Sequence, residues 1–187
     1  MRFFTQIAAF AAAAATLASA NTVKFINQDD TTRKIVFTPS AGYPAVASVT
    51  IQGNQPKTVD IPDSWVGNAY SVSEGAPDVP GMLAEFTFQG WSDLTYYDVS
   101  AIVNPADTVG VKQIFPASQL EATPKTLASG CLLFPCATAY YAPQDVQTVT
   151  TTETDLIVTL GNAANVASRE VQPGTLVPRH YVLGKLS

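Results

Sequence analysis

The chain has 187 residues, with 15 acidic against 10 basic side chains and a formal net charge of -5. This balance, with no basic cluster denser than Arg33-Lys34, disfavours nucleic acid and anionic membranes as partners, because contacts to phosphate groups need Lys or Arg. The length fits one domain followed by a short tail. We therefore expect a single domain that exists as a monomer.

Residues 1–20 predict a secretory signal peptide. They contain one positive charge, Arg2, an apolar centre at residues 7–15, and the small residues Ala18-Ser19-Ala20 before Asn21. The apolar centre is shorter than the ~20 residues that a membrane-spanning helix needs, and no later segment is longer or more apolar. The end of the chain lacks the hydrophobic tail of a lipid-anchor signal. We expect a mature protein that is secreted into the extracellular space, with no membrane partner.

Short strand patterns recur along the mature chain, separated by turn residues. The alternating segments are residues 22–27, 34–38, 47–52, 57–61, 65–73, 83–88, 95–103, 110–115 and 146–160. Turn residues at 28–31 and 53–56 predict two hairpins, one joining the first two strands and one joining the next two. Residues 116–127 allow one short helical turn. The pattern predicts an all-β fold, a sandwich or flattened barrel with short loops and little helix.

The two cysteines, Cys131 and Cys136, predict a disulfide, because an even pair in a secreted protein is normally oxidised. Closing so short a loop stabilises the fold by only about 2 kcal/mol. The alternative is a metal site, but His180 is the only histidine and lies far along the chain. We expect no metal and no cofactor, since the sequence also lacks phosphate-binding, G-x-S-x-G and H-E-x-x-H motifs.

Residues 82–103 place two carboxylates on what we expect to be neighbouring strands. Glu85 lies in one alternating segment, and Asp98 follows Tyr96 and Tyr97 in the next, with a turn at residues 90–93 between them. Carboxylates beside aromatic rings suit a sugar-binding cleft or an acid–base site. The second member of each adjacent tyrosine pair, Tyr97 and Tyr141, is assigned to the lining of this cleft.

The segments LAEFTFQG (83–90), TYYDVSAIV (95–103) and CATAYYAPQD (136–145) resemble, in order and spacing, motifs of the thaumatin-like family. The resemblance extends over about residues 21–161 and is strongest to the short members that filamentous fungi secrete, some of them associated with the cell wall and spore germination. It implies a thaumatin-like β-sandwich with an acidic cleft, in which Glu85, Asp98 and Asp145 fall on acidic cleft positions.

Some features of that family do not transfer to this chain. The cleft arginine has only a loose counterpart in Lys57, and a further cleft aspartate has only Asp107 as a candidate. The usual eight disulfides are reduced to at most one. Residues 162–187 fall outside the resemblance and show no clear period, so we expect them to form a disordered C-terminal extension.

Three functions follow as hypotheses. The first is a non-catalytic wall or matrix protein that binds the cell-wall polysaccharide β-glucan and takes part in wall remodelling or germination. The second is an endo-β-1,3-glucanase, with Glu85 as general acid and Asp98 as nucleophile or base. The third is an adhesin or antigen that binds host or matrix proteins.

Overall fold

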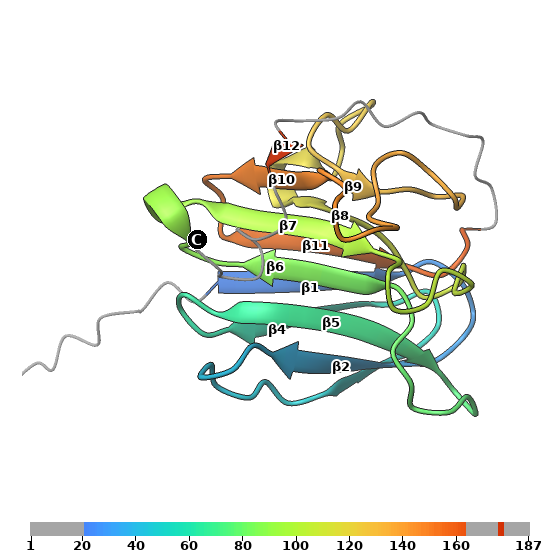
Figure 1. The fold of residues 1–187 in the computed structure, drawn as a ribbon. Coiled ribbons are helices and arrows are strands. Elements are labelled where there is room, and N and C mark those ends of the chain that lie inside the picture. Colours follow the sequence, from blue (N-terminus) through green and yellow to red (C-terminus); the bar gives the residue numbers. More distant parts are fainter. Residues whose placement is uncertain (1–20, 164–175, 178–187) are drawn as a thin grey trace, which may run out of the picture.

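The computed structural model describes residues 21–163 and 176–177. The predicted signal peptide (1–20) and most of the predicted extension (162–187) lie outside the described residues. Within these residues the chain forms strands, with two short 3-10 turns, η1 (Trp91–Asp93) and η2 (Ala117–Gln119). The strands belong to two sheets that lie one behind the other in Figure 1. The predicted all-β sandwich is confirmed, and η2 is the short turn expected within residues 116–127.

The smaller sheet has five strands and contains the parallel pair β1–β11. Alternate side chains of β1, including Val23 and Phe25, are buried in the core, while those between them face the other way. The neighbours of the parallel pair run antiparallel. The strand order is β4 (Pro56–Ile61), β1 (Asn21–Asn27), β11 (Asp155–Leu160), β8 (Val111–Pro116), β9 (Ser129–Gly130).

The larger sheet has seven antiparallel strands and faces the viewer in Figure 1. At one edge β12 pairs with β10, with Leu176 opposite Val149 and Val177 opposite Thr148. These two residues of the predicted extension therefore continue the sheet. The order is β12 (Leu176–Val177), β10 (Thr148–Thr151), β7 (Thr95–Ser100), β6 (Leu83–Thr87), β5 (Val66–Ser73), β2 (Arg33–Pro39), β3 (Val49–Ile51).

The two hairpins predicted at the start of the chain are wrong. β1 and β2 belong to different sheets, and so do β3 and β4. The side-chain amide of Asn27 donates to the backbone oxygens of Thr31 (2.7 Å) and Gln52 (3.0 Å), which directs the chain across the sandwich instead of back on itself. The connection between β6 and β7, by contrast, is the predicted hairpin, with η1 at its tip.

The core between the sheets is organised by aromatic rings. Successive ring pairs have centroids between 5.1 and 6.5 Å apart, in tilted or edge-on contacts. The rings belong to Phe25, Phe37, Trp65, Phe86 and Phe88. Because Phe86 and Phe88 point into this core, the alternating residue Glu85 must project from the outer face of the seven-stranded sheet.

A buried ion pair fixes the crossover between β1 and β2. The guanidinium of Arg33, whose side chain is 1% exposed, donates to both carboxylate oxygens of Asp29 at 2.5 and 3.0 Å. It also donates to the backbone oxygens of Thr31 and Val109. Burial opposes ionisation of Asp29, but the hydrogen bonds from Arg33 and from backbone N–H groups lower its pKa to about 2.

Candidate functional site

The hairpin β6–β7 places Glu85 and Asp98 directly opposite each other, with Asn68 of β5 on the other side of Glu85. We call these residues the acidic row. Glu85 and Asp98 are deeply buried, at 2% and 0% exposed, whereas Asn68 is only partly buried. Glu85 and Asp98 each make further interactions in the structure, so neither carboxyl group lacks a partner.

Two hydroxyl side chains extend the acidic row. The Thr148 hydroxyl donates to Oδ2 of Asp98 at 3.0 Å, and the Tyr140 hydroxyl lies 3.0 Å from the same Thr148 oxygen. All three residues are buried. Burial raises the pKa of Tyr140, and the negative charge of Asp98 raises it further. Sequence reasoning did not assign Tyr140 and Thr148 to the site.

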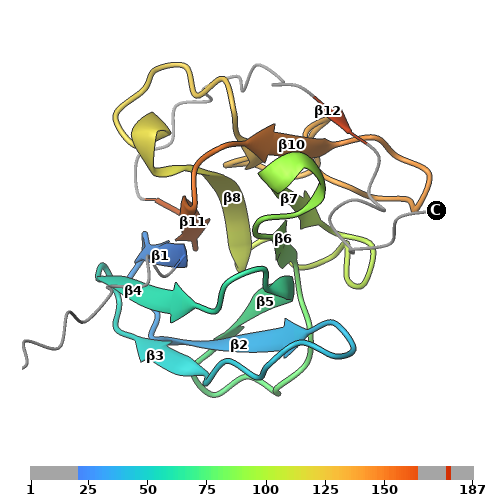
Figure 2. The ribbon, with the colours of Figure 1, turned by 90° about the vertical axis from the view of Figure 1, so that its left-hand side faces the viewer.

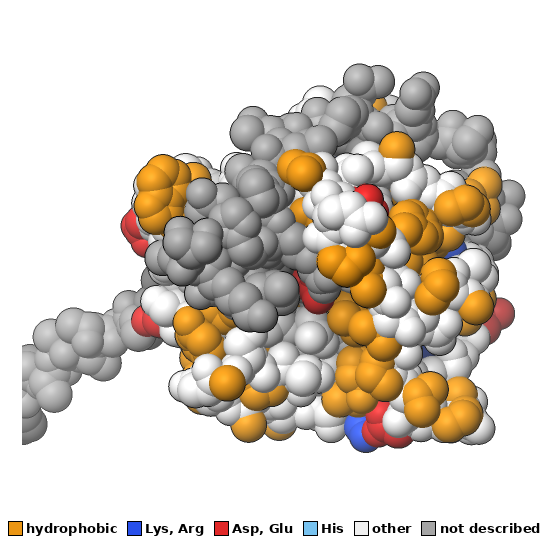
Figure 3. All heavy atoms as spheres, viewed as in Figure 1, with side chains coloured by type: hydrophobic (Ala, Val, Ile, Leu, Met, Phe, Trp, Pro, Cys, Tyr) orange, Lys and Arg blue, Asp and Glu red, His pale blue; other side chains and the backbone are white. Residues whose placement is uncertain are grey.

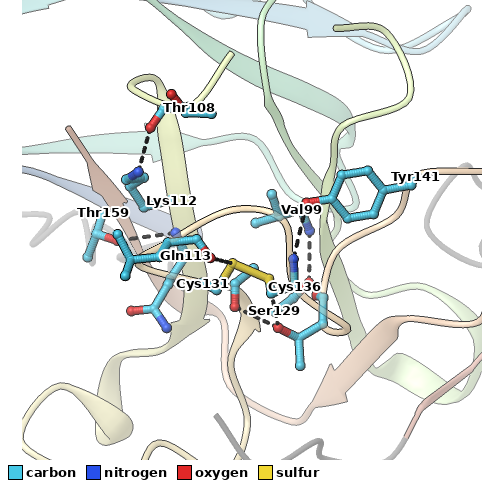
Figure 4. The surroundings of a disulfide bond; sticks show 12 residues. Val99, Thr108, Lys112, Gln113, Ser129, Cys131, Cys136, Tyr141 and Thr159 are labelled. Atoms are coloured by element: carbon cyan, nitrogen blue, oxygen red, sulfur yellow. Dashed lines mark hydrogen bonds between the residues drawn. A yellow bond between two sulfur atoms is a disulfide. The ribbon is translucent and has the colours of Figure 1, made fainter. Parts of the chain in front are cut away.

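Tyr140 follows the disulfide, and the segment around the bridge is bonded to β7. Figure 4 shows the disulfide with Ser129 and Val99 near it. Cys131 and Cys136 are bonded, which confirms the predicted bridge. The adjacent Ser129 hydroxyl accepts a hydrogen bond from the backbone N–H of Val99 (2.9 Å), next to Asp98 in β7. The backbone N–H of Tyr140 donates to the Val99 carbonyl, also at 2.9 Å. The loop is thus attached to β7 on both sides of the bridge.

Asp145 and Tyr141 lie in the segment that follows the disulfide. Oδ2 of Asp145 accepts hydrogen bonds from the backbone N–H groups of Tyr141 and Ala142, each at 2.9 Å, and these bonds lower its pKa. The Tyr141 hydroxyl accepts from the backbone N–H of Cys136 at 3.3 Å. These bonds hold the turn between the disulfide and β10.

Tyr97 faces the core. Its hydroxyl donates to the backbone oxygen of Leu127 at 2.6 Å, and burial raises its pKa. Tyr96 instead shares the outer face with Asp98, and its hydroxyl donates to the backbone oxygen of Trp91 at 2.9 Å. Strand alternation contained this signal, because Tyr97 is adjacent to Asp98 and Tyr96 is two residues from it.

Lys57 and Asp107 are not part of the acidic row. Lys57 lies on β4 of the other sheet, opposite Phe25. Asp107 accepts hydrogen bonds from the backbone N–H groups of Met82 (2.8 Å) and Gly110 (2.9 Å), which holds the loop before β8. Within residues 21–163 and 176–177 there is no group of three potential metal ligands, and no helix long and apolar enough to span a membrane.

The tip of the β6–β7 hairpin lies at the end of the two strands that carry Glu85 and Asp98, and it is exposed. Trp91 is 59% exposed, and Figure 3 shows hydrophobic surface at this tip. Ser92 and Asp93, which follow it, both have left-handed backbone angles, with φ of 57° and 58°. For residues other than glycine this conformation costs of order 1 kcal/mol each, and such strain clusters at functional sites. The turn therefore displays a tryptophan beside an exposed carboxylate.

The fold and the disulfide define a two-sheet β-sandwich protein of the kind found in oxidising compartments. The chain is 48% identical over 139 residues to the antigenic protein SchS21 of Stachybotrys chartarum, covering 74% of this chain and 93% of that protein. It belongs to the same family as SchS21. No family model matches the chain.

Among solved structures the chain is similar to the protein elicitor MoHrip2 from Magnaporthe oryzae. The TM-score is 0.55 at 15% identity, with 76% of this chain and 99% of that chain covered. At this identity the likeness concerns the fold alone. The resemblance to thaumatin-like proteins stays a prediction.

Proposed function

We propose that this chain is a secreted, non-catalytic protein of the fungal wall or extracellular matrix, and that it binds β-glucan through the tip of the β6–β7 hairpin. The observation that carries the proposal is the exposed Trp91 on a strained turn. An aromatic face suits the apolar side of a sugar ring, and the neighbouring Asp93 is exposed and able to accept hydrogen bonds from sugar hydroxyls. Such binding would attach the protein to the wall during remodelling or germination.

The rigidity of the turn supports this role. The backbone N–H of Gly90 donates to the carbonyl of Leu94 at 2.8 Å, and that of Asp93 donates to Gly90 at 3.0 Å. The Tyr96 hydroxyl holds the Trp91 carbonyl from the outer face of the sheet. A turn held by its own hydrogen bonds loses little conformational entropy when it binds a ligand.

Hydrolysis by Glu85 and Asp98 has weaker support. A glycosidase needs both carboxyl groups within hydrogen-bond reach of the scissile bond or of the attacking water. Side chains only 0–2% exposed do not meet this requirement for a polysaccharide chain at the surface. Binding at the exposed hairpin tip requires no such access.

A pull-down on insoluble β-1,3-glucan, combined with a reducing-sugar assay, tests the proposal. We expect the protein to bind without releasing sugar, and Trp91→Ala to weaken binding about tenfold, in keeping with the loss of a stacking contact. Tyr43→Ala is the matched control, because Tyr43 is also an exposed aromatic residue but lies in the loop between β2 and β3. Equal binding by Trp91→Ala and the native protein would overturn the proposal.

The same assay examines the glucanase alternative. Sugar release that disappears in both Glu85→Gln and Asp98→Asn would establish catalysis by the acidic row. Release that persists in both variants would exclude these carboxylates as the catalytic pair.

The relationship to SchS21 favours a second candidate, that this chain is an antigen. The relative is named as an antigenic protein and shares almost half of its residues with this chain over most of both lengths. Antibodies raised against SchS21 should then bind this protein in its native form. Failure of such antibodies to bind would separate the two proteins as antigens without affecting the glucan proposal.

A further inference from the structure

The outer face of the five-stranded sheet carries a pocket of about 320 Å³ that is separate from the acidic row. It lies beneath the loop that follows β8, shown in yellow arching away from the sheets in Figure 2. Its lining is mainly apolar, with a few polar side chains, the composition expected of a site for a small molecule. The volume lies at the lower end of the range for such sites.

The floor of the pocket is one row of side chains across three strands. Ile26 of β1 lies opposite Thr159 of β11, and Thr159 lies opposite Gln113 of β8. Phe115, two residues along β8, continues the floor on the same face. Along this row the floor is therefore apolar at Ile26 and polar at Thr159 and Gln113.

The roof is held by a lysine. The Lys125 ammonium donates to the backbone oxygens of Gln119 (2.7 Å), Leu120 (2.6 Å) and Ala122 (3.3 Å), and it lies 4.7 Å from the centroid of the Phe115 ring. These bonds fix Leu120 above the sheet while the space beneath it remains open. Because three carbonyls take up the ammonium donors, Lys125 acts here as a support for the roof and not as an anion receptor.

One amide side chain in the lining, that of Gln113, lacks the hydrogen bonds that amides in sheltered positions normally make. Gln113 is only 5% exposed; its backbone N–H donates to the Thr159 hydroxyl, but its side-chain amide has no hydrogen-bond partner among the described residues. Oε1 of Gln28 also has no partner, but it is fully buried, so a ligand in the pocket does not reach it. A ligand that hydrogen-bonds to the Gln113 amide would be stabilised.

We propose that this pocket binds a neutral, mainly apolar alcohol or phenol. The Gln113 side-chain amide offers both a donor and an acceptor, and a hydroxyl group can bond to either. The apolar body of the ligand would lie against Ile26, Phe115 and Leu120. A carboxylate is disfavoured because it would bring a negative charge into a mainly apolar pocket in which the Lys125 ammonium is already bonded to three carbonyls.

Nuclear magnetic resonance titration of the full chain with 1-octanol tests this proposal. We expect saturable shifts of the backbone amide signals of Ile26, Gln113 and Thr159. The ether 1-methoxyheptane, which has a similar shape but no O–H group, should bind about tenfold more weakly, because a buried acceptor is left without its donor. Equal affinity for the ether, or shifts spread over the whole surface, would overturn the proposal.

Variants locate the binding site. Gln113→Leu should weaken 1-octanol binding about tenfold and reduce the preference for the alcohol over the ether, while Gln144→Leu, at an exposed glutamine in another loop, should change neither. Leu120→Trp, which fills the pocket from the roof, should abolish binding. Circular dichroism should show that Gln113→Leu and Leu120→Trp both remain folded. Undiminished binding by folded Leu120→Trp would overturn the assignment to this pocket.

Discussion

Charged side chains are buried at two places in the sandwich. At one place the neighbouring groups have opposite charges, and at the other both are acidic. At the β1–β2 crossover, Arg33 faces the carboxylate of Asp29 and the backbone oxygens of Thr31 and Val109, so opposite charges meet. On the outer face of the other sheet, Glu85 and Asp98 set two carboxylates opposite each other. The first arrangement pairs opposite charges, whereas the second places two acidic side chains side by side, with the Thr148 hydroxyl donating to Asp98.

The largest effect is expected when the Asp29–Arg33 pair is broken. Asp29→Asn leaves the buried guanidinium without its counter-charge and should lower the free energy of unfolding by about 3 kcal/mol, measured by urea denaturation. The matched control is Asp78→Asn, which removes the partner of Lys34 in an ion pair whose side chains are about half exposed. That change should cost at most about 1 kcal/mol. Equal losses in the two variants would remove the distinction between the buried and the exposed pair.

Removing the hydroxyl of Thr148 should cause the next largest loss of stability. Thr148→Val keeps the shape of the side chain but removes the group that joins Tyr140 to Asp98, so we expect a loss of about 2 kcal/mol. Thr150→Val, two residues along β10, is the control and should change stability by less than about 0.5 kcal/mol. A neutral Thr148→Val variant would show that this hydroxyl adds nothing to the acidic row.

Removing the disulfide should have a similar or slightly smaller effect. The double variant Cys131→Ser, Cys136→Ser opens a loop with a sequence separation of 5, which corresponds to about 2 kcal/mol in the chain-entropy model. The same loss should appear when the native protein is denatured with and without reductant. Because the loop carries Tyr140, the variant should also make the backbone amide of Ala101, which donates to the Tyr140 carbonyl, exchange faster with solvent.

The stability of the fold should also depend on pH. The folded-state pKa of Asp29, about 2, lies below its ordinary value of 3.8, so its contribution to stability is present above pH 4. This contribution should be lost progressively as the pH falls from about 4 towards 2. Denaturation at several pH values should show this loss in the native protein and a shallower slope over that interval in Asp29→Asn. Parallel slopes would mean that Asp29 does not titrate as described.

Local alternation was sufficient to predict where most strands lie and that Glu85 and Asp98 lie on neighbouring strands. It failed for the first two connections, because their strands pair with partners distant in sequence. β1 lies between β4 and β11, a choice that depends on the whole sandwich and not on the turn residues 28–31.

In the candidate site, too, positions within adjacent strands were predictable and contacts between distant segments were not. The positions of Glu85 and Asp98 follow from two adjacent strands, and the same alternation places Tyr96, not Tyr97, beside Asp98. Tyr140 reaches the acidic row only through the disulfide loop and the bond between Ser129 and Val99, which no local pattern encodes. The pocket beneath the β8 loop likewise arises from three strands and a loop that meet only in the folded chain.

The short strand β12 has a practical consequence for anyone who produces this protein. Leu176 and Val177 cover the outer edge of β10, so a recombinant version that stops at Gly161 would present the bare backbone donors and acceptors of β10 to solvent. Open strand edges of this kind recruit other chains and promote aggregation. Versions that extend beyond Val177 keep that edge covered, and a purification tag at the C-terminus is best separated from it by a polar linker.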